Sequence, residues 1–315
     1  MRSLTLARAL EVQGAQVAFA ATPFVSEVLD RFAPDVRRED GDPQAVGAFD
    51  AIVFDHFGLG AADHRRFRRD RPAMAIDDLA DRPMAVEVLL DAGPERTAAD
   101  YEGLAPRARL LLGPRWALVR PPFAAARQSA LARREAGGEV GRVLVSMGLT
   151  DVGGITGRIV QRLLPRTDAT LDVVVGPAAP SLEALKRLSR REPRVRLHES
   201  LGAEAMAALC AEADLAVGAG GSTTWERCVL GLPAVVVVLA GNQQPGARAV
   251  AHAGAAECVD ARTSDFEAAL DRSFTGLVRS PERRKRMARQ ASALCDGQGA
   301  ERAAREFLAV MAGAS

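Results

Sequence analysis

The fold of this chain is decided by the stretch Asp214–Gln244, DLAVGAGGSTTWERCVLGLPAVVVVLAGNQQ. Its pattern predicts a short apolar strand at 215–217, a turn of small residues at 218–221, a helix that begins at 222–224, and a second apolar run at 234–240. A strand, a glycine-rich turn and a helix start rich in hydroxyl groups are typical of sites that receive a phosphate. The alternative is a tight strand-to-helix turn closed by a good N-cap, and the stretch alone favours neither.

Several properties of such a turn suit an anion. The first turn of a helix has unpaired N–H groups and a partial positive charge. Glycines, here Gly220 and Gly221, let the backbone approach the anion closely, and the hydroxyls of Ser222, Thr223 and Thr224 add hydrogen-bond donors. These five residues are therefore candidate ligands of a phosphate group.

Length and composition indicate a two-domain α/β protein. The chain has 315 residues, of which 48% are hydrophobic and 4% aromatic. Two domains of ordinary size account for this length, and Ala-, Val- and Leu-rich segments suit parallel strands that are buried on both faces. A net charge of +1 gives no argument for nucleic acid as a partner.

Cysteine spacing and apolar runs bear on the compartment. No two of the four cysteines form a CxxC pair, so the sequence predicts neither a zinc knuckle nor a redox motif, and the thiols are expected to be reduced and structural. No apolar run reaches the ~20 residues of a membrane span, and the first residues lack the pattern of a signal peptide. We expect a cytoplasmic monomer without membrane insertion.

The order of the predicted elements places the domain boundaries. Strands at 142–146, 171–175 and 195–197 alternate with helices at the spacing of βα units, which predicts a parallel sheet. A helix at 1–13 opens the chain, and from the usual order of doubly wound domains we expect a strand before it. The predicted domains are 1–122 and 141–315, joined by a linker at 123–140.

Polar side chains that follow strands are further candidates, because ligands of open α/β sheets bind beyond the carboxyl ends of strands. Asp55, His56 and Phe57 end the strand predicted at 50–55, and the imidazole of His56 is a candidate general base. A structural hydrogen bond between His56 and Asp55 is the alternative. Asp151, which follows the strand at 142–146, either orients water or substrate or caps the next helix.

Several motifs together resemble a known family. They follow one another in the same order along nearly the whole chain, and their combination is specific although no single motif is. The motifs are MRSLTLARAL (1–10), DHFG (55–58), IDDLADR (76–82), LGPRWALVRP (112–121), MGLTD (147–151), GAGGSTTWERC (218–228), GLP (231–233) and NQ (242–243). With them the chain resembles the UDP-2,4-diacetamido-2,4,6-trideoxy-β-L-altropyranose hydrolases of pseudaminic acid biosynthesis. The resemblance implies the GT-B fold, in which two Rossmann-like domains face a cleft.

The resemblance also implies roles in binding a UDP-sugar. The helix opened by Ser222–Thr224 would hold the diphosphate, and Glu226 would accept hydrogen bonds from the ribose hydroxyls. Asn242 and Gln243 would face the sugar, and Asp55–Phe57 would face it from the other domain. Gly148 and Thr150 lie in the matching loop of the second domain and are expected to contact the substrate.

The implied reaction is a hydrolysis. Water would attack the anomeric carbon with inversion, and the helix dipole and N–H groups would stabilise the leaving UDP without a metal or another cofactor. Asp55, His56 and Asp151 are the candidate catalytic residues of this chain.

This sequence departs from the family pattern at three places. Phe57 stands where the family usually has Tyr, which removes a hydroxyl, and Leu149 stands where it usually has Gly, which makes the loop bulkier. The family also opens with a strand and a Gly-rich loop whose His is the expected main base, and Met1 aligns just after that loop. We expect either a true start about 20 residues upstream or a natural remnant that binds the UDP-sugar but hydrolyses it poorly.

Two other function classes fit the same motifs. A GT-B glycosyltransferase would have the same donor site, because the fold does not fix the reaction. Residues 1–120 show no apolar segment with basic flanks for a lipid-linked acceptor, which favours water as the acceptor. A non-catalytic UDP-sugar-binding protein is the third possibility.

Overall fold

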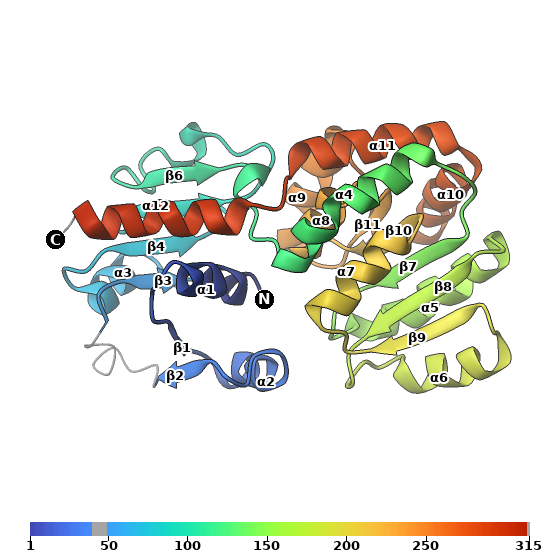
Figure 1. Ribbon diagram of the computed structural model, residues 1–315, viewed down its shortest axis with the longest axis horizontal. Coiled ribbons are helices and arrows are strands. Elements are labelled where there is room, and N and C mark those ends of the chain that lie inside the picture. Colours follow the sequence, from blue (N-terminus) through green and yellow to red (C-terminus); the bar gives the residue numbers. More distant parts are fainter. Residues whose placement is uncertain (40–48, 314–315) are drawn as a thin grey trace. The chain divides into compact units, whose positions relative to one another are not determined.

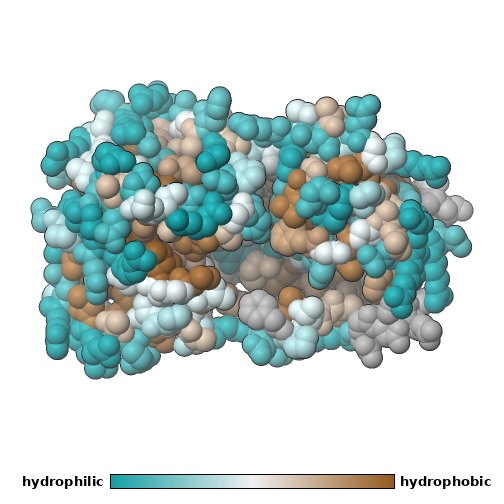
Figure 2. Space-filling view, turned by 180° about the vertical axis from the view of Figure 1, so that it is seen from behind, coloured by the Kyte–Doolittle hydropathy of each residue, from teal (hydrophilic) through white to brown (hydrophobic). Residues whose placement is uncertain are grey.

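The structure of the protein is a computed structural model, which describes residues 1–39 and 49–313. The chain divides into two compact units (Figure 1). Unit 1 contains Met1–Leu118 and Gln298–Ser315, and unit 2 contains Val119–Gly297. On the face shown in Figure 2, hydrophilic residues form most of the outer rim of each unit, and apolar residues gather toward the middle. No helix in the described part of the chain is both long and apolar enough to span a bilayer.

Unit 2 is built on a six-stranded sheet in which every neighbouring pair of strands is parallel. The strand order is β12-β11-β10-β7-β8-β9. The strands are β7 (Arg142–Ser146), β8 (Thr170–Val175), β9 (Val195–Glu199), β10 (Leu215–Ala219), β11 (Ala234–Val238) and β12 (Glu257–Asp260). The helices are α4 (Pro121–Ala136), α5 (Ile155–Leu163), α6 (Leu182–Arg191), α7 (Ala203–Glu212), α8 (Thr223–Val229), α9 (Gln244–His252), α10 (Phe266–Arg279) and α11 (Pro281–Leu294).

The core of unit 2 explains why its strands are valine-rich runs. Every residue of β11 is buried, and side chains of β7, β8, β10 and β11 form one cluster with residues of α5 and α10. Helices cover both faces of the sheet (Figure 1), so successive side chains of a central strand are buried on either face. The predicted α/β fold with a parallel sheet is confirmed.

The strand order of unit 2 reverses beside β7. From β7 the chain moves outward through β8 to β9, then returns to the other side of β7 and moves outward again through β10, β11 and β12. The loops that follow β7 and β10 therefore leave the same edge of the sheet in opposite directions. Such a switch point is where open α/β sheets bind their ligands.

Unit 1 contains two separate parallel sheets in its described residues. One has the order β1-β2 and the other β3-β4-β5-β6. The strands are β1 (Ala18–Ala20), β2 (Arg37–Glu39), β3 (Ile52–Phe54), β4 (Ala73–Ile76), β5 (Val88–Asp91) and β6 (Arg109–Leu112). The helices are α1 (Arg2–Val12), α2 (Pro23–Phe32), α3 (Ala61–Arg68) and α12 (Gly299–Gly313).

Helix α1 packs against both parts of unit 1. Its residues Leu6 and Leu10 belong to the core cluster of β4 and β5. Leu4 packs against a small cluster in and just after α2, as does Phe19 of β1. The amphipathic helix predicted at 1–13 is thus confirmed. The expectation that a strand precedes it stays a prediction.

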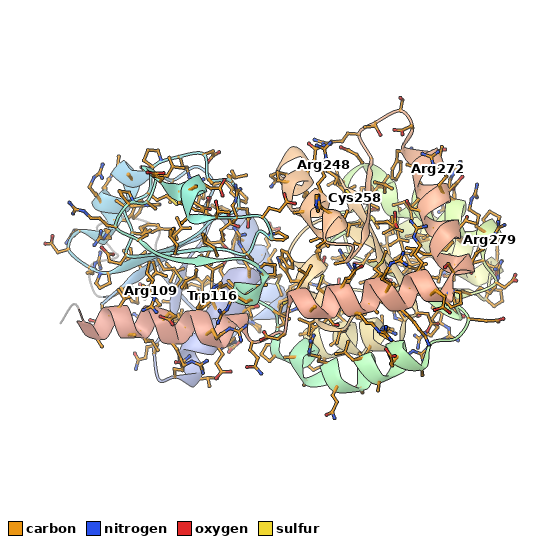
Figure 3. The ribbon with its side chains drawn as sticks, turned by 90° about the horizontal axis from the view of Figure 1, so that it is seen from above. Arg109, Trp116, Arg248, Cys258, Arg272 and Arg279 are labelled. Carbon is orange, nitrogen blue, oxygen red and sulfur yellow. The ribbon has the colours of Figure 1, made fainter. Side chains whose placement is uncertain are left out.

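The last helix departs from the predicted domain boundaries. Although 141–315 was predicted to form one domain, α12 packs on unit 1, where Phe307 is buried beside α1. Arg109 of β6 forms an ion pair with Glu306 at 2.6 Å, and Figure 3 shows Arg109 and Trp116 beside this helix. The sequence pattern shows that α12 has an apolar face, but not which surface covers that face.

The predicted linker at 123–140 is also different in the structure. Most of it is helix α4, which belongs to unit 2 and packs against α7. Phe123 is fully buried, and Arg127 donates hydrogen bonds to the carbonyl oxygens of Val229 at 2.6 Å and Cys295 at 2.9 Å. Pro121 and Pro122, just before the predicted linker, begin the helix, where their missing N–H groups leave no hydrogen bond unmade.

Candidate functional site

Three loops lie at the carboxyl ends of β7, β10 and β11. Val217 and Gly218 of β10 pair with Val145 and Ser146 of β7, so the loops that follow these strands begin side by side. The predicted contact residues in these loops are largely accessible: Gly148, Thr150, Gly221, Ser222 and Asn242 are exposed, and Thr223 is half-buried. The structure thus brings the candidate residues of unit 2 to one edge of one sheet.

Gly220 packs tightly between β11 and the loop after it. Its N–H donates to the carbonyl oxygen of Val237 at 3.0 Å. A Cβ atom at this position would lie 3.3 Å from Val236 and 3.4 Å from the Cβ of Gln243. Gln243 turns its amide oxygen back to accept from the N–H of Leu239 at 2.9 Å, so this oxygen braces the loop. The predicted contact of Gln243 with a sugar stays a prediction.

Glu226 is held by an arginine that the sequence analysis did not select. Arg120 donates from Nε to Oε1 of Glu226 at 2.6 Å and from Nη2 to Oε2 at 3.0 Å. Glu226 is 6% exposed, and the guanidinium of Arg120 also lies 5.0 Å from the ring centre of Phe123. Each carboxylate oxygen keeps one further acceptor position. The ion pair therefore orients Glu226 and still allows it to accept more hydrogen bonds.

Arg227 is a second arginine that the sequence analysis missed. It is 4% exposed and donates from Nη2 to the carbonyl oxygen of Ala219 at 2.9 Å and to the hydroxyl of Thr224 at 3.0 Å. A Cβ atom on Gly218 would lie 2.4 Å from Nη1 of Arg227. The sequence analysis placed Gly218 in the turn, whereas the structure places it inside β10, where a glycine marks such a close approach.

The contacts of Asp151 are those of a structural cap. It is fully buried, its Oδ1 accepts from the N–H of Thr156 at 2.8 Å, and its Oδ2 accepts from the N–H of Ser181 at 3.0 Å and from the Ser181 hydroxyl. These bonds tie the loop after β7 to the starts of α5 and α6. They favour the capping alternative over the orientation of water.

Next to this loop, Gly176 leaves no room for a side chain. A Cβ atom there would lie 2.1 Å from the carbonyl oxygen of Leu149. The backbone of the loop after β7 therefore rests directly on the end of β8.

Asp55 of unit 1 is an ion-paired carboxylate. Arg2 donates to its Oδ1 from Nε at 3.0 Å and from Nη2 at 2.7 Å, and the hydroxyl of Ser3 donates to Oδ2. Burial by itself raises the pKa of Asp55, but the hydrogen bonds and charge of Arg2, with the hydroxyl of Ser3, bring it below its ordinary value. Asp55 is thus an anion that anchors α1, and it is a weak base.

His56 and Phe57 are accessible at the carboxyl end of β3. Nδ1 of His56 accepts from the N–H of Gly58 at 3.0 Å, which leaves Nε2 without a partner among the described residues. The structural alternative weighed for His56, a hydrogen bond to Asp55, is not among the described contacts. Phe57 is 44% exposed, and the guanidinium of Arg2 lies 5.6 Å from its ring centre.

A buried polar network lies beside these residues at the carboxyl ends of β4 and β5. The hydroxyl of Tyr101 lies 2.9 Å from Oδ2 of Asp77 and 2.7 Å from Oδ2 of Asp91. Asp77 also accepts from the N–H groups of Leu79 and Ala80, as the acidic residue of a tight turn does. Within residues 1–39 and 49–313, no group of three or more His, Cys, Asp or Glu side chains is arranged to hold a metal ion.

Comparison with solved structures decides the fold. The crystal structure of MurG from Acinetobacter baumannii superimposes with a TM-score of 0.71 and 17% identity over 98% of this chain and 95% of that one. The chain has a GT-B fold. Residues 199–306 match the model of the glycosyltransferase family 28 C-terminal domain, which places the glycine turn and α8 inside the matched region. The protein is therefore glycosyltransferase-like.

Two curated relatives have different activities in their names. The UDP-N-acetylglucosamine–N-acetylmuramyl-(pentapeptide) pyrophosphoryl-undecaprenol N-acetylglucosamine transferase of Salinibacter ruber is 35% identical over 181 residues, which are 55% of this chain and 47% of that protein. The UDP-2,4-diacetamido-2,4,6-trideoxy-β-L-altropyranose hydrolase of Campylobacter jejuni is 24% identical over 213 residues, 64% of this chain and 73% of that protein. The chain spans about half the length of two curated relatives that it matches, 47% of the Salinibacter transferase and 43% of the spore coat polysaccharide biosynthesis protein SpsG of Bacillus subtilis.

Proposed function

We propose that unit 2 binds the UDP part of a nucleotide-sugar at the switch point between β7 and β10. The observation that carries this proposal is the convergence of the loops after β7 and β10 at one edge of the sheet, where exposed glycines and hydroxyls meet. Relatives whose names specify UDP-sugars support the identity of the ligand.

The contacts of unit 2 suggest how the nucleotide is held. Gly221, Ser222 and Thr223 present N–H and hydroxyl donors at the start of α8, and these would bind the diphosphate. Glu226, fixed by Arg120, would accept from the ribose hydroxyls with its remaining acceptor positions. Asn242, exposed after β11, would contact the sugar.

We propose that the reaction is hydrolysis of a UDP-linked 2,4-diacetamido-2,4,6-trideoxy sugar. Water attacks the anomeric carbon, the bond from this carbon to the phosphate oxygen breaks with inversion, and UDP leaves as an anion that the donors of unit 2 stabilise. In unit 1, His56 is the candidate base because its Nε2 is accessible, whereas Asp55 is tied to Arg2. The likeness to the Campylobacter hydrolase supports this substrate class.

Sugar transfer is the second candidate. The matching family model describes a glycosyltransferase domain, and the Salinibacter relative, which is 35% identical, is named as a transferase. The donor site would be the same, and only the acceptor would differ.

The experiment that tests these proposals measures UDP binding and UDP release separately. Calorimetry with UDP tests the nucleotide site, with Glu226→Gln as the variant expected to weaken binding and Glu135→Gln, on the exposed face of α4, as the matched control. Release of UDP from UDP-2,4-diacetamido sugars is then followed in water enriched in ¹⁸O. Label in the free sugar supports hydrolysis, whereas release that requires an added sugar acceptor supports transfer. Absence of UDP binding contradicts both.

A further inference from the structure

Arg227 is a buried cation without a carboxylate partner in the described part of the chain. It is 4% exposed, and it donates hydrogen bonds to a carbonyl oxygen and two threonine hydroxyls. The adjacent carboxylate, Glu226, is bound through both oxygens to Arg120. Nε of Arg227 is buried and has no hydrogen-bond partner. A buried charge in this state is costly unless something else compensates it.

The guanidinium of Arg227 lies at the switch point itself. It packs against Gly218, where an added Cβ atom would lie 2.4 Å from Nη1 and 3.2 Å from the carbonyl oxygen of Ser146. Gly218 and Ser146 are paired residues of β10 and β7 near the carboxyl ends of these strands. The positive charge therefore lies directly beneath the turn that presents Gly220 and Gly221.

The hydrogen bonds of Arg227 orient two threonine hydroxyls of α8. Nη1 lies 3.3 Å from the hydroxyl of Thr223, and Nη2 lies 3.0 Å from that of Thr224. A guanidinium only donates, so both hydroxyl oxygens accept from it and their hydrogens point away from it. In residues 1–39 and 49–313, neither hydroxyl donates a hydrogen bond to a protein acceptor. Both are left as donors for a ligand.

Helix α8 alone gives little positive potential to this turn. It has seven residues, so its dipole is short, and a surface anion would be screened by water. A full charge in the buried layer below the turn is screened much less. Burial lowers the pKa of Arg227, yet arginine stays protonated in proteins, so the charge is permanent.

We propose that Arg227 is a positioning residue for the diphosphate of the nucleotide. Its charge attracts the two phosphates, and its forked donors turn the hydroxyls of Thr223 and Thr224 toward them. This inference rests on the proposed function, and it adds that the site selects a diphosphate over an uncharged nucleoside because of Arg227.

The test compares UDP with uridine on the full chain. Arg227→Met keeps an unbranched side chain that reaches about as far as Nε, and it removes the guanidinium with its charge and donors. It is expected to weaken UDP binding about 10–100-fold, measured by calorimetry, and to leave uridine binding within about twofold. Because replacing a buried charge without a counterion by an apolar side chain is often neutral or stabilising, the melting temperature without ligand is expected to stay equal or to rise. A purely structural arginine would give a lower melting temperature and no selective loss of UDP.

Two conservative variants keep the test decisive if Arg227→Met does not fold. Arg227→Lys retains the charge without the fork and is expected to recover part of the UDP affinity, and Thr223→Val removes one hydroxyl and is expected to weaken UDP about 3–10-fold with uridine unchanged. Arg272→Met, on α10 (Figure 3), makes the same change of net charge on an exposed residue and serves as the control.

Each outcome bears on one of the two proposals. An unchanged ratio of UDP to uridine affinity in Arg227→Met, or in both conservative variants, overturns the role of Arg227 and leaves the nucleotide site standing. If the unmodified protein binds neither UDP nor uridine, the proposed function fails, and the role of Arg227 fails with it.

Discussion

The ion pair between Arg120 and Glu226 allows one prediction to be worked out in detail. Glu226→Gln keeps the shape of the side chain and removes its charge, which leaves Arg120 with 14% of its side chain exposed and no carboxylate partner. Removing one member of a buried pair costs about 3–5 kcal/mol. Since Arg120 keeps some contact with water and lies over Phe123, we expect a loss toward the lower end, about 2–4 kcal/mol of the free energy of unfolding of unit 2.

The two tryptophans of the chain allow unit 2 to be followed by itself. Trp225 lies in α8 beside Glu226, whereas Trp116 belongs to unit 1. In a Trp116→Phe background, fluorescence during urea unfolding therefore reports unit 2. With a slope of roughly 2 kcal/mol/M for a domain of this size, the expected loss shifts the urea midpoint down by about 1–2 M. Calorimetry should show UDP binding about 10–100-fold weaker, because a charge-assisted hydrogen bond to the ribose is lost.

Glu135→Gln is the matched control for this prediction. Glu135 pairs with Arg289 at 2.6 Å, but 63% and 68% of the two side chains are exposed. An exposed pair contributes about 0–1 kcal/mol, so the urea midpoint should shift by less than about 0.5 M. An unchanged midpoint in Glu226→Gln would refute the buried pair. Lower stability with unchanged UDP affinity would show that Glu226 is structural and does not bind the ribose.

Three further predictions concern buried groups. Burial, helped by nearby arginines, lowers the pKa of His64 to about 4. The stabilising effect of the neutral imidazole is therefore complete above the unfolded pKa of about 6.5 and is lost as the pH falls toward 4. Urea unfolding should show about 2–3 kcal/mol less stability at pH 4.5 than at pH 7.5, and His64→Phe should reduce this difference. Tyr101→Phe removes the hydroxyl that lies between the carboxylates of Asp77 and Asp91, and should lower the free energy of unfolding by about 1–3 kcal/mol. An unchanged melting temperature would contradict a stabilising role of this network. Gly176→Ala places a methyl group against the carbonyl oxygen of Leu149. It should lower the free energy of unfolding by about 1–3 kcal/mol and also weaken UDP binding, because the loop after β7 has to shift. An unchanged free energy of unfolding would mean that this loop moves freely.

The sequence was informative wherever the information is local. The apolar runs after 142 and the glycine turn at 218–221 predicted a parallel α/β unit, and the structure and its GT-B neighbours confirm that fold. The strand predicted at 142–146 coincides with β7 to the residue. Local patterns succeed here because backbone conformation and the spacing of buried side chains are properties of a few consecutive residues.

The candidate site was predicted only in its outline. The loops at the switch point were identified, but Arg120 and Arg227 were not, since a sequence does not show which arginines are buried. Arg120 lies 106 residues from Glu226, and Arg2 lies 53 residues from Asp55. Pairs at such distances along the chain leave no periodic signal.

By itself, the sequence determined the class of fold, the order of the elements and the turn that the rest of the chain is built around. The tertiary structure alone decided that α12 packs on unit 1, that α4 belongs to unit 2, and that a charged arginine lies beneath the turn 218–221. The physical reason is that an amphipathic segment specifies a face to bury but not the surface that covers it. Likewise, a charged side chain needs a partner, but the sequence does not show where that partner lies. Only the packed chain supplies the covering surface and the partner.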